Sequence, residues 1–152
     1  MLRHAKSDWP EGVADHDRPL AKRGRRDAPR MGQWLAEHGY LPEVVVCSTA
    51  QRTRQTWDLV AAELSGTPEV SYDPRAYGAS AQTLLYLARE LPADCRTALL
   101  IAHNPGVSEL AGVGFPTAAV AVLTFDGDWP DLEPGLARRT AFATPAEIVS
   151  NI

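Results

Sequence analysis

The sequence has few cysteines, no long apolar run and no excess of positive charge. Its two cysteines, Cys47 and Cys95, form neither a metal-binding spacing nor a disulfide framework, so a reducing cytoplasm is the expected compartment. No apolar stretch approaches the length that crosses a membrane, and no secretory signal pattern opens the chain. The net charge of −4 argues against nucleic acid or an anionic membrane as the partner. What remains is one globular domain, 1–152, and a hydrophobic content of 45% is sufficient for a full core.

Alternating apolar runs and amphipathic stretches predict an α/β fold. Two continuous apolar runs, 44–47 and 98–102, are typical of strands buried on both faces of a sheet. Amphipathic spacing predicts helices over 22–38, after Ser48-Thr49, and from Ser80 to Pro92, with Pro29 expected to kink the first helix or mark its start. Short strands are expected around Val70, over 117–125 and over 136–143, followed by a terminal helical turn. This alternation favours a largely parallel sheet.

Three polar clusters supply two arginines and two histidines at corresponding places in the chain. Arg3 and His4 follow the short apolar stub Met1-Leu2, and His103 directly follows the strand at 98–102. Arg52 lies in the first turn of the helix after the strand at 44–47, a helix that Ser48 or Thr49 is expected to cap. Ligands of open α/β sheets bind outside the carboxyl ends of the strands. We therefore expect these side chains to converge.

Two arginines and two histidines together suit phosphoryl transfer. Arginine matches phosphate oxygens bidentately and stays charged, so Arg3 and Arg52 are the natural clamps. Arg52 at a helix start also opposes the helix dipole, so it requires an anion or a carboxylate nearby. A neutral imidazole is a competent nucleophile, and the positive neighbours of His4 favour its neutral form. His103 is expected to donate to the phosphoryl oxygens in the transition state.

The same segments resemble the histidine phosphatase (phosphoglycerate mutase-like) superfamily, in its small SixA-like phosphohistidine phosphatase branch. The matching segments are LRHAKS at 2–7, DRPL at 17–20 with Gly24, CSTAQRTRQT at 47–56 and HNPG at 103–106. The resemblance implies a three-layer αβα sandwich around a mostly parallel sheet. It implies His4 as the phosphohistidine nucleophile, a phosphate pocket of Arg3, Arg52 and His103, and Arg18 near that pocket. It also implies a phosphatase without metal or cofactor, acting on a phosphohistidine protein or a phosphorylated small molecule.

The sequence departs from the family pattern in two places, and the first bears on the substrate. Larger members carry a glutamate proton donor after the second helix, whereas the stretch 71–80 offers only Asp73. Without a positioned acid, a P–N bond to histidine is the favoured substrate, because imidazole leaves as a neutral base once solvent has protonated it. The connection from Leu110 to Phe115 is also shorter than is usual in this branch, and the first strand is very brief. Two readings stay open for the start of the chain: either residues before Met1 are missing, or the first strand is unusually short. Whether a loop near Gly112 is missing stays open in the same way.

Three alternatives stay open. The pocket suits a phosphatase for small phosphomonoesters, or a non-catalytic module that holds phosphorylated peptides. A metal site built from His4, His16, Asp17 and His103 is conceivable, but no helical His pair or Cys spacing supports zinc. Otherwise His16 and His38 are expected to be exposed and without a role.

Overall fold

Six strands form one sheet, in the order β3-β2-β4-β1-β5-β6, in the computed structural model of the chain. The strands are β1 (Leu2–Arg3), β2 (Val44–Ser48), β3 (Glu69–Asp73), β4 (Ala98–Ala102), β5 (Val120–Thr124) and β6 (Arg138–Ala143). Strands β3, β2, β4 and β1 pair in parallel, whereas β5 pairs antiparallel with both β1 and β6. The structure describes residues 1–150, so residues 151–152 of the predicted domain lie outside the described part.

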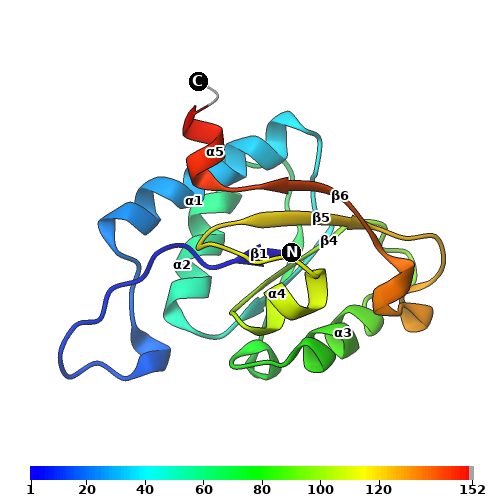
Figure 1. Cartoon of the computed structure of the whole chain (residues 1–152), viewed down its shortest axis with the longest axis horizontal. Coiled ribbons are helices and arrows are strands. Elements are labelled where there is room, and N and C mark those ends of the chain that lie inside the picture. Colours follow the sequence, from blue (N-terminus) through cyan, green and yellow to red (C-terminus); the bar gives the residue numbers. More distant parts are fainter. Residues whose placement is uncertain (151–152) are drawn as a thin grey trace.

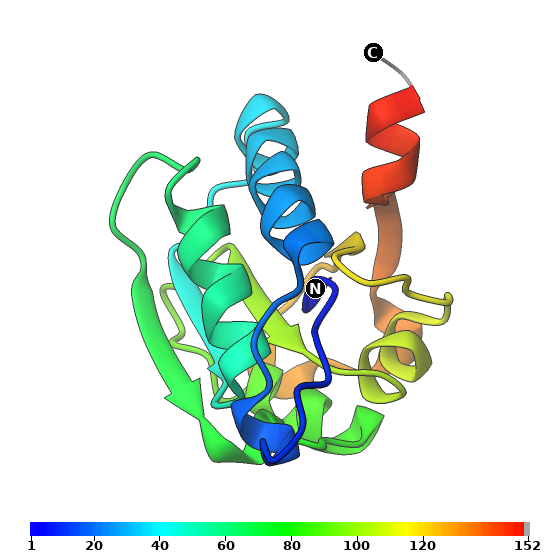
Figure 2. The same ribbon diagram turned by 90° about the vertical axis from the view of Figure 1, so that its left-hand side faces the viewer.

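Helices cover both faces of this sheet (Figures 1 and 2). They are α1 (Lys22–Glu37), α2 (Gln51–Ala61), α3 (Ala81–Arg89), α4 (Gly106–Ala111) and α5 (Pro145–Ser150). Helices α1 and α2 pack together on one face with α5 beside α1, and α3 and α4 cover the other face. The predicted three-layer αβα sandwich with a mostly parallel sheet is confirmed. None of the helices described is long and apolar enough to cross a membrane.

Each face of the sheet has its own apolar core, and β4 contributes to both. Leu99 and Ile101 point into the core beneath α1 and α2, whereas Leu100 and Ala102 point into the core beneath α3 and α4. Successive side chains of a strand face opposite sides, so a strand in the middle layer must be apolar throughout. The prediction that the continuous apolar run at 98–102 is a strand buried on both faces of the sheet is thus confirmed.

Local signals mark the start of α3 and the end of α1. Ser80 caps α3 by accepting a hydrogen bond from the backbone N–H of Thr83, and Gly39 takes a left-handed φ of +73° after α1. Pro29 does not mark the start of α1, because the helix begins at Lys22 and contains Pro29 in its interior.

Strand β1 is only two residues long but lies at the centre of the sheet. It pairs with β4 through Leu2 and Arg3, and Leu2 also pairs with β5. The backbone bonding continues past its end, because His4 N donates to Ala102 O at 3.2 Å and His4 O accepts from Ala118 N at 2.9 Å. The first polar residue after β1 is therefore held on both sides by neighbouring chain.

Candidate active site

The carboxyl ends of three neighbouring strands bring the predicted site residues together. His4 follows β1 and His103 follows β4, while β2 leads to Arg52 in the first turn of α2, and β4 lies between β2 and β1. One cavity of about 280 Å³ is lined by all five side chains assigned to the site from the sequence, namely Arg3, His4, Arg18, Arg52 and His103. The other lining residues are Lys6, Ser7, Trp9, Asn104 and Thr117.

One hydrogen bond orients the imidazole of His4. Its Nδ1 lies 2.8 Å from the carbonyl oxygen of Ala5, which can only accept, so Nδ1 carries the proton and Nε2 presents a lone pair. Burial is the main cause that lowers the pKa of His4 to about 3; Arg52 and Arg3 act in the same direction, against the raising effect of the Ala5 hydrogen bond. His4 is therefore neutral and available as a nucleophile at physiological pH.

The chain around His4 is fixed by contacts to both α1 and α2. Ala5 N donates to Thr56 Oγ1 at 3.0 Å, and that hydroxyl donates to Arg52 O at 2.7 Å. On the other side, Lys6 O accepts from Ala21 N just before α1. A Cβ atom on Gly24 of α1 would lie 2.1 Å from Lys6 O, so this close approach requires glycine.

His103 is held by Ser48 rather than by solvent. Its Nε2 lies 2.7 Å from Ser48 Oγ, and burial, followed by Arg52, lowers the pKa of His103 to about 4. The same hydroxyl accepts from Ala50 N, and α2 has Ala50 at its N-cap without a side-chain cap. The prediction that Ser48 or Thr49 caps α2 is therefore wrong, because the Ser48 hydroxyl is shared between Ala50 N and the imidazole of His103.

Two buried nitrogens of the cavity residues, Nε of Arg3 and Nδ1 of His103, have no hydrogen-bond partner within residues 1–150. When Ser48 donates to Nε2 of His103, Nδ1 of that ring carries the proton, so both nitrogens are unpaired donors. A buried unpaired donor costs about 1–3 kcal/mol, which an incoming oxygen ligand would recover. Arg3 is otherwise fixed through Nη1, which donates to Phe115 O at 2.9 Å.

Asp15, which the sequence analysis missed, is the carboxylate that Arg52 requires. Arg52 Nη2 lies 3.2 Å from Asp15 Oδ2, Arg52 Nη1 donates to Asp15 O at 2.7 Å, and Arg18 Nη1 lies 3.0 Å from Asp15 Oδ1. The Tyr77 hydroxyl also donates to this carboxylate. Tyr77, then Arg18 and Arg52, hold the pKa of Asp15 well below its usual range, so Asp15 is ionised and orients both guanidinium groups.

Only one of the contacts of Asp15, the one to Arg18, could have been predicted from the sequence. Asp15 and Arg18 are three residues apart in a short 3₁₀ turn, Asp15–Asp17, within the blue loop that extends from the body of the molecule in Figure 1. That local pair was readable in the sequence. The contacts to Arg52 and Tyr77 join residues 37 and 62 positions away, and no spacing rule predicts them.

Three further expectations from the sequence, on His16, Asp73 and a metal site, can be compared with the structure. His16 is not inert, because Nε2 lies 2.8 Å from Thr49 Oγ1 and its ring packs edge-on against Tyr77. Asp73 does not line the cavity; it binds Arg75, which lowers its pKa and makes it a poor proton donor. Within residues 1–150, no group of three or more His, Cys, Asp or Glu side chains is arranged to hold a metal, so the four-residue metal alternative has no cluster.

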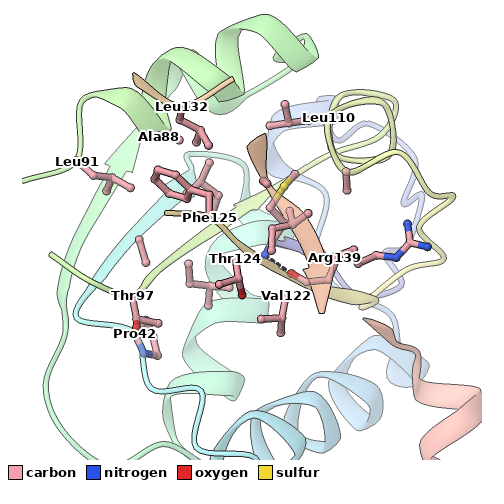
Figure 3. A pocket seen from close by; sticks show the side chains of 18 of the residues that line it. Pro42, Ala88, Leu91, Thr97, Leu110, Val122, Thr124, Phe125, Leu132 and Arg139 are labelled. Atoms are coloured by element: carbon pink, nitrogen blue, oxygen red, sulfur yellow. Dashed lines mark hydrogen bonds between the residues drawn. The ribbon is translucent and has the colours of Figure 1, made fainter. Parts of the chain in front are cut away.

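A second, larger cavity of about 640 Å³ lies near the start of β4 and the end of β5, at the opposite end of the sheet (Figure 3). Its wall is mostly apolar and includes Leu110, Val122, Phe125 and Leu132. None of the residues predicted for the phosphate pocket lines it, so the smaller cavity is the candidate active site.

Comparison with known proteins defines the class. The family model of the histidine phosphatase superfamily (branch 1) matches residues 1–76, which include Arg3, His4, Arg18 and Arg52. The chain therefore belongs to the histidine phosphatase superfamily.

The relatives cover nearly the whole chain. An uncharacterised protein of Mycobacterium tuberculosis is 38% identical over 161 residues, which span 95% of this chain and 99% of that protein. Among solved structures, a candidate phosphohistidine phosphatase SixA from Nakamurella multipartitia has a TM-score of 0.82 at 32% identity, covering 95% of this chain and 93% of that one. The protein histidine phosphatase SixA complexed with tungstate has a TM-score of 0.76 at 24% identity over 97% and 96% of the two chains, and this likeness shows the fold alone.

Proposed function

We propose that this protein is a phosphatase that transfers a phosphoryl group to His4 and then to water, with phosphohistidine as its substrate class. The observation that carries the proposal is the neutral, buried His4, with Nδ1 committed to Ala5 O, in a cavity that Arg3, Arg18 and Arg52 also line. A nucleophilic nitrogen beside three guanidinium groups suits phosphorus as the electrophile.

The chemistry divides into two displacements at phosphorus. In the first, Nε2 of His4 forms a bond to phosphorus while the bond to the leaving nitrogen breaks and its electron pair stays on that nitrogen. In the second, a water oxygen displaces His4, a water proton goes to solvent or phosphate, and inorganic phosphate leaves. Arg3 Nε and His103 Nδ1 supply donors to the phosphoryl oxygens in both steps, since neither has a partner in the described part of the chain.

The lack of a proton donor favours a nitrogen leaving group. Among the residues that the structure describes, those that line the cavity include no Asp or Glu, and Asp73 is paired with Arg75 elsewhere. An alkoxide must be protonated as it leaves, whereas imidazole has an unperturbed pKa near 6.5 and leaves as a neutral base after protonation by solvent. A cavity of about 280 Å³ also suits one phosphorylated side chain better than a large metabolite.

A turnover screen tests this function directly. We expect kcat/KM to be highest for a phosphohistidine peptide, lower for p-nitrophenyl phosphate and lowest for an alkyl phosphate, all without added metal. Rapid quench with labelled substrate should trap an acid-labile, base-stable label on His4. Label on serine or aspartate would refute the mechanism. Fast alkyl phosphate hydrolysis that collapses in Asp73→Asn would instead identify a general phosphatase, and binding without turnover would identify a phospho-ligand binding module.

Arg52→Ala provides a second test with a matched control on the same helix. Removing a charged contact to the transferring group should lower kcat/KM by about 10²- to 10³-fold. Arg54 lies two residues further along α2 but donates to Thr49 O and packs over Tyr72, outside the cavity. Arg54→Ala should therefore leave kcat/KM nearly unchanged, and equal losses in both variants would contradict the assignment of Arg52.

A further inference from the structure

Among the large apolar side chains that the structure describes, that of Trp9 is the most exposed, with 76% of its surface accessible, yet Trp9 lines the candidate active-site cavity. The guanidinium carbon of Arg18 lies 3.2 Å from the centre of its ring, so one face of the indole is covered by a cation. With that face covered, an exposure of this size places most of the other face in solvent. Trp9 is thus a largely exposed aromatic residue of the cavity lining, with one ring face free.

The position of Trp9 is fixed although the side chain is exposed. Arg18 is buried, and besides its contact with Asp15 it donates to Ser7 Oγ at 2.6 Å and to Asp8 O at 2.9 Å. The backbone before Trp9 is paired with the chain after Arg18, through Asp8 N to Pro19 O and a bridge between Ser7 and Leu20. The indole therefore lies on an ordered support rather than on a loose loop.

This arrangement places a flat apolar surface next to the phosphate subsite. Arg18 contacts the indole, and both residues line the cavity that Arg3, His4 and Arg52 also line. In phosphohistidine the imidazole is bonded directly to phosphorus, so its ring lies beside the phosphoryl group. In a phosphoserine the corresponding atoms are an oxygen and a methylene carbon, which offer no plane to stack.

We propose that Trp9 is a specificity-determining residue, whose open face stacks on the planar ring of the group bonded to phosphorus, the imidazole of phosphohistidine. The choice of imidazole rests on the proposed function. The stack is present both in the ground state and in the transition state, so it contributes mainly to KM rather than to kcat.

Kinetics on Trp9→Ala and Trp9→Phe test the proposal. Aromatic pairs contribute an amount that corresponds to about three- to tenfold in affinity. In Trp9→Ala we expect the ratio of kcat/KM for a phosphohistidine peptide to that for phosphoramidate, which has no ring, to fall by this factor, through KM. Trp9→Phe should restore most of the ratio. Tyr86→Ala removes another exposed aromatic, from α3 outside the cavity, and should leave the ratio unchanged.

The outcomes separate this inference from the proposed function. Equal losses on phosphohistidine and phosphoramidate, or no loss on either, would overturn the stacking role and leave Trp9 as a support for Arg18 or as a bystander. If the wild-type protein hydrolyses only phosphomonoesters, the proposed function fails. The stacking role is then decided by the preference for phenyl over methyl phosphate, which must fall in Trp9→Ala and which overturns the role if it does not.

Discussion

Acidification below pH 6.5 should destabilise the folded protein through His4 and His103. Their pKa values in the fold are lowered to about 3 and about 4, mainly by burial, whereas in the unfolded chain both return to about 6.5. As the pH falls below 6.5, the unfolded chain binds protons that the folded chain does not, so the free energy of unfolding decreases. The loss begins below pH 6.5 and continues down to about pH 4 for His103 and about pH 3 for His4.

The magnitude follows from the size of the shifts. Each pKa unit corresponds to about 1.4 kcal/mol of differential stability. Between pH 7.5 and pH 5, each histidine should cost about 2 kcal/mol, or about 4 kcal/mol for the pair. Because a domain of this kind has about 5–15 kcal/mol of total stability, the effect is large enough to measure.

Urea unfolding at pH 7.5 and pH 5, followed by tryptophan fluorescence, measures this loss. The buried Trp57 lies in the core beneath α1 and α2 and reports on unfolding. The reference is the double variant His4→Asn, His103→Gln, which places uncharged amides near the two hydrogen-bonded ring nitrogens. Other titrating groups contribute equally to both proteins and cancel in the difference. The wild type should lose about 4 kcal/mol more than the variant, and equal losses would show that the fold does not hold these imidazoles neutral.

Two further predictions concern residues that position the site. Asp15→Asn should lower kcat by about three- to tenfold with little loss of vanadate affinity, because Arg18 and Arg52 keep their charge but lose the group that orients them. The same change should lower the pKa of Tyr77 in a spectrophotometric titration, since the Asp15 hydrogen bond is the main cause of its raised value. If neither kcat nor the Tyr77 titration changes, Asp15 does not orient the two arginines. Gly24→Ala should cost about 1–3 kcal/mol in urea unfolding, because its Cβ would meet Lys6 O at 2.1 Å. Gly135→Ala, whose Cβ meets nothing within 4 Å, should hardly change the free energy of unfolding. Equal stability of the two variants would show that the backbone at Lys6 moves away from a Cβ at position 24 without cost.

The parts of the fold that could be predicted are those that local chemistry determines. A strand in the middle layer must be apolar on both faces, so the run at 98–102 identified β4, and Ser80 marked the start of α3. Convergence of His4 and His103 followed from one further rule, that ligands bind where parallel strands end. The order of the strands in the sheet was not predicted, because pairing depends on contacts distant in the sequence.

The misses at the site have the same physical origin. The conflict between Arg52 and the helix dipole required a carboxylate, but Asp15 is supplied by a loop 37 residues earlier in the chain. Ser48 precedes a helix and has the chemistry of a cap, yet His103, 55 residues later, competes for its hydroxyl. In both cases the local sequence identified a group that must be paired, the Arg52 guanidinium or the Ser48 hydroxyl. Its partner comes from a distant part of the chain, so the local sequence does not predict it.

The central position of β1 determines how far the protein must unfold before His4 is displaced. Its two residues are bonded to β4 on one side and β5 on the other, and His4 continues this bonding in both directions. Fraying of the outer strands β3 or β6 would leave His4 in place, because neither strand pairs with β1. Displacing His4 requires opening the middle of the sheet, which also exposes both apolar cores. The proposed phosphatase activity should therefore persist when the outer strands fray and be lost only with the cooperative unfolding of the whole structure.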